Sequence, residues 1–213
     1  MATSDFIHRF VPATGGDGTT LLLLHGTGGN EDDLLGLGRV MAPGAALLSP
    51  RGKVLENGMP RFFRRLAEGV FDQQDLLART HELAAWVRVA AAEYALDPTC
   101  IVAVGFSNGA NVAAAALLLH PDLLAGAVLF RAMVPFEPEH APNLTGIPVL
   151  LGAGRGDPIV PAANTERLAD LLRTAGARVT LDWRPGGHSL GQAEVEDAAR
   201  WLATARGGPD AGK

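Results

Sequence analysis

A serine between two glycines is the feature of this chain that most directly suggests chemistry. Residues 105–109 read Gly-Phe-Ser-Asn-Gly, after an apolar run at 100–104 and before an alanine- and leucine-rich segment at 111–120. A serine at such a strand-to-helix corner sits in a strained turn, with its hydroxyl near the positive end of the following helix. The pattern makes Ser107 a candidate nucleophile. An ordinary strand-to-helix turn is the alternative that the pattern by itself leaves open.

A serine hydroxyl is a weak nucleophile at neutral pH, so it needs a base within hydrogen-bond reach. Of the six histidines, His188 is the predicted base, because it stands in Pro-Gly-Gly-His-Ser between the last strand-like segment and the last helical one. Loops that follow the strands of a parallel sheet lie at its ligand-binding edge. His140, in a proline-rich segment, stays an alternative, whereas we expect a structural part for His25, at the start of a glycine-rich loop.

The base in turn needs an acid that orients it. Asp157 follows a late apolar run and stands in Gly-Asp-Pro-Ile-Val-Pro, residues 156–161. A structural Asp-Pro turn is the alternative, and Asp182 is the main rival, although it lies within a strand and close before His188. The chain order Ser107, Asp157, His188 is the order of the α/β-hydrolases, and it predicts a catalytic triad of these three residues.

Acyl transfer also needs N–H donors for the oxyanion of the tetrahedral intermediate. We predict two backbone amides: that of Asn108, directly after the serine, and that of Thr27, in the loop Leu-His-Gly-Thr-Gly-Gly-Asn at residues 24–30. The same loop invites an interpretation as a phosphate cradle, but it lacks the Gly-Lys-Ser/Thr ending of a P-loop. No two histidines stand four residues apart. We therefore expect no nucleotide, no metal and no other cofactor.

These residues need a parallel sheet to bring them together. Strand-like runs alternate with helical segments, which is typical of an α/β fold with a mostly parallel sheet of about seven strands and helices on both faces. The first strand is expected at an antiparallel edge, joined to the second by a glycine-rich turn at 15–18, and segments 50–75 and 133–147 are expected to be irregular. A single domain at 1–205 and a disordered tail at 206–213 complete the prediction. The predicted strands are 6–11, 20–24, 46–48, 101–104, 127–130, 149–151 and 179–183, and the predicted helices are 31–41, 75–94, 110–119, 165–174 and 192–203.

Composition and net charge limit the classes of protein to which this chain can belong. With 47% hydrophobic and 19% charged residues, the 213-residue chain is apolar enough to build a globular core. A net charge of −5 argues against a nucleic-acid partner, and no apolar run is long enough for membrane insertion. Without a signal-peptide pattern, and with Cys100 as the only cysteine, a cytoplasmic location is expected. The cluster Arg61, Arg64 and Arg65 fits a solvated rim or a place near an anionic substrate group.

Taken together, the motifs resemble the phospholipase/carboxylesterase branch of the α/β-hydrolases, and small bacterial carboxylesterases above all. The resemblance implies a minimal α/β-hydrolase fold without a large cap domain, and a cofactor-free serine esterase. It places the triad at Ser107, Asp157 and His188, and the oxyanion amides at Thr27 and Asn108. The motifs that carry it are residues 24–30, Ser-Pro-Arg-Gly at 49–52, and the segments 105–109, 156–161 and 187–188.

The resemblance extends to the segment at residues 55–64, which is similar to a loop that covers the active site in this branch. It implies that Phe62, Phe63 and Phe71 form an apolar wall for the substrate, and core packing is the alternative for each of them. Without an inserted cap the pocket is expected to be open and shallow, which suits short-chain or aromatic esters.

The sequence therefore predicts a serine carboxylesterase that hydrolyses small carboxylic esters through an acyl-enzyme on Ser107. Two alternatives stay open. One is a thioesterase or lysophospholipase that uses the same residues on longer acyl chains, and the other is a non-catalytic binding protein with a hydrolase fold. A small-molecule ester is the expected partner, and a homodimer is plausible from the family.

Overall fold

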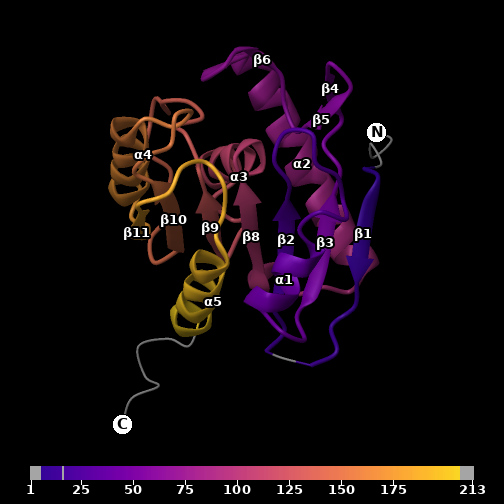
Figure 1. Cartoon of the computed structure of the whole chain (residues 1–213). Helices are drawn as coiled ribbons and strands as arrows, with labels where there is room; N and C mark the ends of the chain where they lie inside the picture. Colours follow the sequence, from indigo (N-terminus) through magenta and orange to yellow (C-terminus); the bar gives the residue numbers. More distant parts are fainter. Residues whose placement is uncertain (1–5, 16, 207–213) are drawn as a thin grey trace.

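A seven-stranded sheet forms the centre of the molecule (Figure 1), with strand order β1-β3-β2-β8-β9-β10-β11. The computed structural model describes residues 6–15 and 17–206. All neighbouring strands are parallel except β1, which pairs antiparallel with β3 at the edge. The predicted sheet is therefore confirmed. Its strands are β1 (His8–Val11), β2 (Thr20–Leu24), β3 (Ala46–Pro50), β8 (Ile101–Phe106), β9 (Gly126–Phe130), β10 (Pro148–Gly154) and β11 (Arg178–Arg184).

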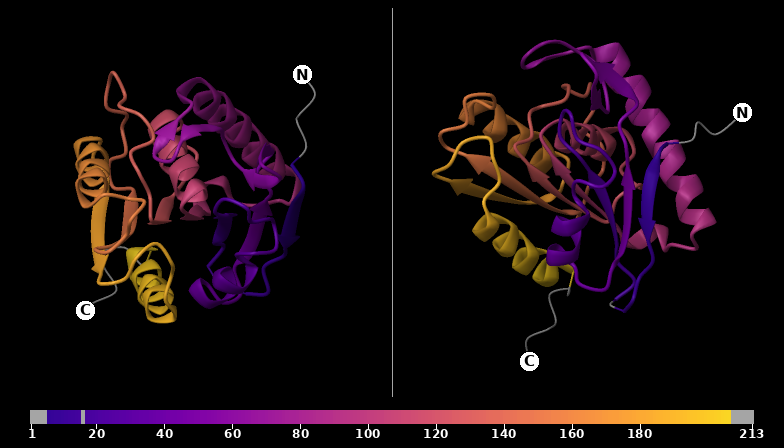
Figure 2. Two further views of the ribbon diagram at one scale, coloured as in Figure 1. Left: turned by 45° about the horizontal axis from the view of Figure 1, so that its top comes forward. Right: turned by 45° about the vertical axis from the view of Figure 1, so that its right-hand side comes forward.

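Helices cover both faces of the sheet, as the alternation of segments predicts. In Figure 2 (left), α1 and α5 lie on one side of the strands, and α2 and α3 lie on the other. The helices are α1 (Leu35–Met41), α2 (Gln73–Glu93), the short 3₁₀ helix η1 (Pro98–Cys100), α3 (Asn108–Leu119), α4 (Ala162–Thr174) and α5 (Gln192–Arg206). No helix in the described part of the chain is long and apolar enough to cross a membrane.

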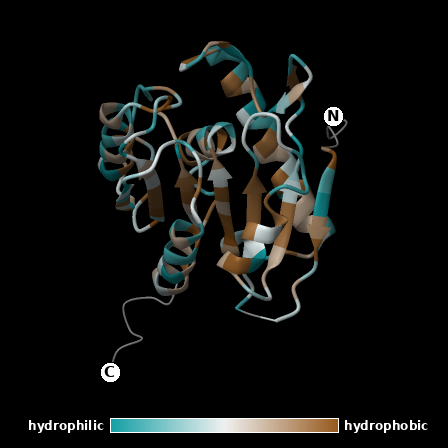
Figure 3. Ribbon diagram, in the orientation of Figure 1, coloured by the Kyte–Doolittle hydropathy of each residue, from teal (hydrophilic) through white to brown (hydrophobic). Residues whose placement is uncertain are grey.

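The two faces hold separate hydrophobic cores, because successive side chains of a strand point to opposite sides. In β2, Leu22 and Leu24 pack into the core under α2, α3 and α4. Leu21 and Leu23 pack into the smaller core under α1 and α5. Both faces of β2 are thus apolar, as expected for a covered parallel sheet, and the central strands in Figure 3 are correspondingly brown.

The segment predicted to be irregular at residues 50–75 contains two short hairpins and the start of α2. Strand β4 (Val54–Glu56) pairs with β5 (Met59–Arg61), and β6 (Arg65–Ala67) pairs with β7 (Val70–Phe71). Asn57 and Gly58 connect the first pair, with φ values of 52° and 81°. Two successive residues with positive φ make the tight turn that Asn-Gly sequences favour, so this hairpin carried a local sequence signal.

The observed bounds and pairing of other elements differ slightly from those predicted from the sequence. Helix α1 begins at Leu35 instead of residue 31, and β1 pairs with β3 instead of its neighbour in sequence, β2. The glycine-rich turn expected at 15–18 includes residue 16, which lies outside the described residues. Helix α5 runs to Arg206, one residue beyond the predicted domain boundary. The tail predicted at 206–213 otherwise lies outside the described residues.

Candidate active site

The carboxyl edge of the sheet brings the three predicted triad residues into contact. Ser107 follows β8, Asp157 follows β10 and His188 follows β11. The Nε2 atom of His188 lies 2.9 Å from Ser107 Oγ, and its Nδ1 atom lies 2.8 Å from Asp157 Oδ2. In the neutral histidine, Nδ1–H donates to the carboxylate and Nε2 accepts from the hydroxyl. This is the arrangement in which a histidine can take a proton from serine.

The backbone holds Ser107 in a strained turn. Its φ of 52° and ψ of −114° lie outside the regions that residues with a side chain ordinarily adopt. The Ser107 N–H donates to the carbonyl of Phe130 on the neighbouring strand at 2.8 Å. Glycine is required on both sides: a Cβ at Gly105 would lie 2.7 Å from the backbone of Ala110, and one at Gly109 would overlap the carbonyl of Leu24. The geometry is that of a serine raised above the sheet edge.

The carboxylate of Asp157 is fixed by its own loop. Its side chain is fully buried, and Oδ1 accepts the backbone N–H groups of Ile159 at 2.8 Å and Val160 at 3.1 Å. Oδ2 is thereby left for His188. The rival Asp182 accepts instead from Arg184, two residues further along β11.

The other histidines lie in surroundings that differ from that of His188. His25 is buried, donates through Nδ1 to the Gly26 carbonyl at 2.6 Å and accepts the Gly52 N–H at Nε2, 3.0 Å away. Burial lowers the pKa of His25, since the charged imidazolium is poorly solvated there. This neutral side chain ties two loops together, which is the structural part expected for it. His140 lies exposed in the proline-rich segment.

Both predicted oxyanion residues line the cavity beside Ser107. Asn108 is the first residue of α3, so its N–H has no acceptor within the helix. The loop of Thr27 is held by the β4–β5 hairpin. Arg61 Nη1 donates to Thr27 Oγ1 at 2.6 Å, and the N–H of Gly28 donates to the carbonyl of Pro60 at 2.9 Å. Thr27 and Asn108 therefore line the same cavity as Ser107.

The cavity itself has a volume of about 280 Å³. Of the three phenylalanines assigned to its wall, the structure places only Phe71 there. Phe62 and Phe63 are 3% and 0% exposed and belong to the main core, because the chain between the two hairpins turns inward. The core-packing alternative therefore describes Phe62 and Phe63. The remaining apolar lining comes from Phe106, Met133, Ile159 and Val160.

The basic cluster divides between the cavity and the surface. Arg61 and Arg65 line the cavity and share the carboxylate of Glu56, at 3.2 Å and 2.9 Å respectively. Burial and the nearby charge of Arg65 lower the pKa of Arg61. Arg64 lies at the surface and pairs with Asp72, the residue that caps α2. Two guanidinium groups beside one carboxylate make this wall of the cavity polar.

The described residues contain no group of three or more histidine, cysteine, aspartate or glutamate side chains that could hold a metal ion. One buried charged residue that lines the cavity, Arg131, was not predicted from the sequence. The sequence feature that could have indicated this residue is its position directly after the apolar strand β9, at the edge of the sheet where the site lies.

Comparisons with known proteins extend over nearly the whole chain. Residues 10–206 match the family described as Phospholipase/Carboxylesterase. The protein named "Putative hydrolase MhqD" from Bacillus subtilis (strain 168) is 50% identical over 185 residues, which cover 87% of this chain and 92% of that protein. The crystal structure of the Bacillus cereus carboxylesterase superimposes with a TM-score of 0.92 at 50% identity, covering 94% of each chain. The structure of YahD with malic acid has a TM-score of 0.89 at 31% identity, covering 95% of this chain and all of YahD.

Proposed function

The chain belongs to the phospholipase/carboxylesterase family, with the α/β-hydrolase fold, and from this premise we propose that it is a serine carboxylesterase acting on small carboxylic esters. The observation that carries the proposal is the continuous hydrogen-bonded series from Asp157 through His188 to Ser107. A buried acid, an oriented imidazole and a serine in a strained turn are the parts that acyl transfer requires.

In the proposed reaction, Ser107 Oγ attacks the ester carbonyl carbon while His188 Nε2 takes the hydroxyl proton. The carbonyl oxygen becomes an oxyanion and accepts hydrogen bonds from the amides of Thr27 and Asn108. Loss of one such donor typically costs about 10²- to 10³-fold in kcat. The protonated His188 then gives its proton to the leaving alcohol. Water, deprotonated by His188, attacks the acyl-enzyme, and the protonated His188 returns this proton to Ser107 Oγ as the acid is released.

Cavity size and lining support a small substrate. Ligand pockets usually enclose about 300–1,000 Å³, and this cavity, at about 280 Å³, is slightly smaller than that range. Phe71, Met133 and Val160 offer an apolar surface for a short acyl or aromatic group. Arg61 and Arg65 offer a polar wall on which a carboxylate-bearing ester has a favourable partner. The presence of malic acid, a small acid, in the similar structure of YahD agrees with a substrate of this size.

The test combines labelling with a series of substrates. A fluorophosphonate reagent reacts with activated serines, so we expect one label per chain on the peptide that contains Ser107, and none in Ser107→Ala. p-Nitrophenyl esters of acetate, butyrate, octanoate and laurate then measure chain-length preference, and we expect kcat/KM to fall beyond butyrate. A rise toward laurate would favour the lysophospholipase or thioesterase alternative. A folded protein with neither label nor turnover would favour the non-catalytic binding protein.

A further inference from the structure

Arg131 is a buried charge that the proposed reaction does not use. It follows directly on β9, and its side chain is 1% exposed. Its backbone φ is 58°, a left-handed conformation that costs about 1 kcal/mol or more for a residue other than glycine. A buried guanidinium on a strained backbone persists only where the surroundings compensate for it.

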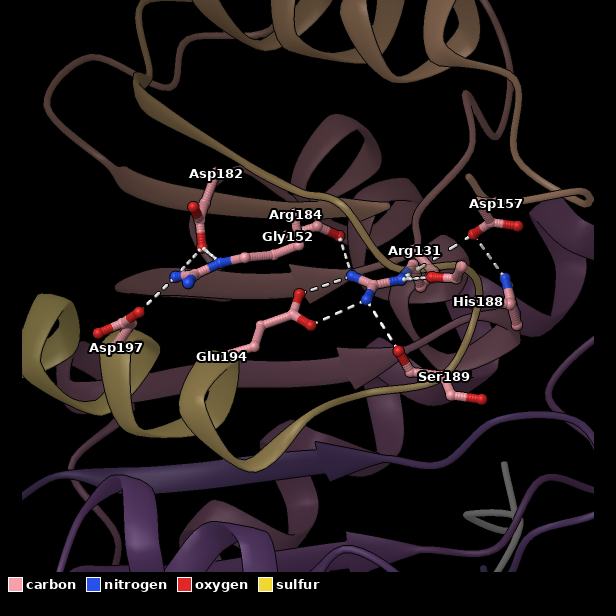
Figure 4. Close-up of polar contacts among 10 residues, drawn as sticks. Arg131, Gly152, Asp157, Asp182, Arg184, His188, Ser189, Glu194 and Asp197 are labelled. Carbon is pink, nitrogen blue, oxygen red and sulfur yellow. Dashed lines mark hydrogen bonds and ion pairs between the residues drawn. The ribbon is translucent and has the colours of Figure 1, made fainter. Parts of the chain in front are cut away.

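Hydrogen bonds to the surroundings compensate for the burial of the Arg131 guanidinium. A guanidinium carries five N–H donors, and each of the five has an acceptor here. Arg131 Nε donates to the carbonyl of Gly187 at 2.9 Å, and Nη2 donates to that of Ser189 at 2.9 Å. Nη1 donates to the carbonyl of Gly152 at 3.1 Å. The remaining two donors bind both carboxylate oxygens of Glu194, at 2.6 Å and 2.8 Å (Figure 4).

Two of these acceptors stand on either side of the proposed catalytic base. Gly187 and Ser189 flank His188, in a loop between β11 and α5 that has neither helix nor strand. Three glycines in that loop, Gly186, Gly187 and Gly191, leave its backbone with high conformational freedom. Restraint must therefore come from outside the loop. In Figure 4 the Arg131 guanidinium lies between Glu194 and the loop that contains His188.

The same short segment contacts the other two members of the proposed triad. Arg131 Nε lies 4.0 Å from Asp157 Oδ2. The carbonyl of Phe130, the preceding residue, accepts the N–H of Ser107 at 2.8 Å. The end of β9 thus touches the serine loop, the acid and the histidine loop together.

We propose that Arg131 is a positioning residue. With Glu194 as its buried counter-ion, it fixes the two carbonyls around His188 and so holds the imidazole between Asp157 and Ser107. The proposal rests on the proposed function, in which His188 is the base. Arg131 contacts the loop backbone and needs no contact with the reacting atoms to act in this way.

A purely stabilising ion pair makes a different prediction. Replacing both members of a buried ion pair by apolar residues of similar size is often neutral for stability. In the double variant R131M/E194M the charges disappear together, but the carbonyls of Gly187 and Ser189 lose their donors. We therefore expect the fold to be retained and the histidine loop to be loosened.

The experiment measures kcat, KM, the rate of fluorophosphonate labelling and the melting temperature for wild type and R131M/E194M. A displacement of about 1 Å in a catalytic group can lower a rate about 100-fold, so we expect kcat and the labelling rate to fall by about 10- to 100-fold. We expect KM to change by less than about threefold, since the apolar lining residues Phe71, Met133 and Val160 are unchanged. A folded double variant with wild-type kcat would overturn the proposal.

Asp197→Asn is the matched control. Asp197 lies three residues after Glu194 on α5 and pairs with Arg184 of β11, so it also ties this helix to the sheet. Figure 4 draws no hydrogen bond or ion pair from Asp197 to His188 or Ser189. We expect kcat and the labelling rate of Asp197→Asn to stay within about twofold of wild type, as for a surface-level change away from the site. An equal loss of activity in this variant would also overturn the proposal.

Single variants keep the test valid if the double variant does not fold. Arg131→Lys keeps the positive charge but has three donors on a shorter head, which cannot reach five acceptors. We expect Arg131→Lys and Glu194→Gln to lower kcat at a temperature where near-ultraviolet circular dichroism shows each to be folded. Full activity in Arg131→Lys would mean that the charge alone suffices and would overturn the proposal. Failure of the proposed function would show separately, as wild-type protein without label on Ser107.

Discussion

Arg61 donates to the hydroxyl oxygen of Thr27 at 2.6 Å, and this bond joins the β4–β5 hairpin to the loop that carries a proposed oxyanion amide. Arg61 is itself buried and also donates to the carbonyl of Phe63. The hairpin therefore acts as a brace for the glycine-rich loop. A loop with Gly26, Gly28 and Gly29 has little intrinsic stiffness, so its shape depends on such contacts.

Thr27→Val tests this brace. Valine keeps the shape and the backbone amide but removes the acceptor of the Arg61 bond. A buried donor left without a partner costs about 1–3 kcal/mol, so we expect a measurable loss in the free energy of unfolding. We expect kcat to fall about tenfold, because the amide of residue 27 is no longer held in place. Steady-state kinetics and urea denaturation check both expectations.

Thr145→Val serves as the control for that change, since Thr145 is exposed and its hydroxyl donates to Asn143 Oδ1 within the same turn. Wild-type kcat in Thr27→Val would contradict the brace.

The strained backbone of Ser107 predicts a gain in stability when function is removed. At φ 52° and ψ −114° a residue with a Cβ is disfavoured, whereas glycine is not. Ser107→Gly should therefore unfold with a free energy about 1 kcal/mol higher than Ser107→Ala, which keeps the Cβ and the strain. Both variants should lack activity and fluorophosphonate label. Thermal and urea denaturation measure the difference, and equal stabilities would mean that the turn carries no strain.

His25 predicts a loss of stability in mild acid. Burial lowers its pKa from the usual 6.5, so the unfolded chain binds a proton that the folded chain resists. Its contribution to stability is therefore complete above about pH 6.5 and is lost as the pH falls below that value. We expect the free energy of unfolding of wild type to fall between pH 7 and pH 5 more steeply than that of His25→Gln.

The comparison uses urea denaturation at each pH, with His140→Gln as the control, because His140 lies exposed in a loop. Parallel pH profiles for wild type and His25→Gln would refute a neutral, buried His25.

Substitutions of Phe71 and Phe63 distinguish a residue that contacts the substrate from one that packs in the core. Their rings meet edge to face, with centroids 5.1 Å apart, yet only Phe71 lines the cavity. Phe63→Ala should destabilise the protein by about 3–5 kcal/mol, because a fully buried ring leaves a void. Phe71→Ala should instead raise KM for butyrate or phenyl esters several-fold with a smaller loss of stability. Kinetics and denaturation of the two variants check this, and the reverse pattern would reassign the two rings.

Much of the fold could be predicted because it depends on short-range patterns. The leucines of β2 are apolar on both faces, which fits only a covered strand. Residues 105–109 marked the strand-to-helix corner, because glycines on both sides of Ser107 are needed to avoid backbone overlap. The Asn57-Gly58 turn is equally local, because Asn-Gly is a dipeptide that favours the two-residue turn joining β4 to β5.

The inward direction of Phe62 and Phe63 was not available from the sequence, because it depends on how the chain between the two hairpins packs into the core beside α2 and α3. The same is true of the contact between Arg131 and the loop of His188, which joins residues 56 positions apart. An arginine after a strand has no preferred partner until the sheet order is known.

The family, the alternation of strands and helices and the three candidate catalytic residues could be predicted from the sequence, because each depends on residue type, spacing and chain order. Which side chains line the cavity, and which groups hold the His188 loop, became clear from the three-dimensional structure. The physical reason is that catalytic geometry of this kind is set by distances of about 3 Å between hydrogen-bonding atoms. Such distances arise from the packing of β9, β10, β11 and α5 against one another. No local sequence pattern predicts this packing.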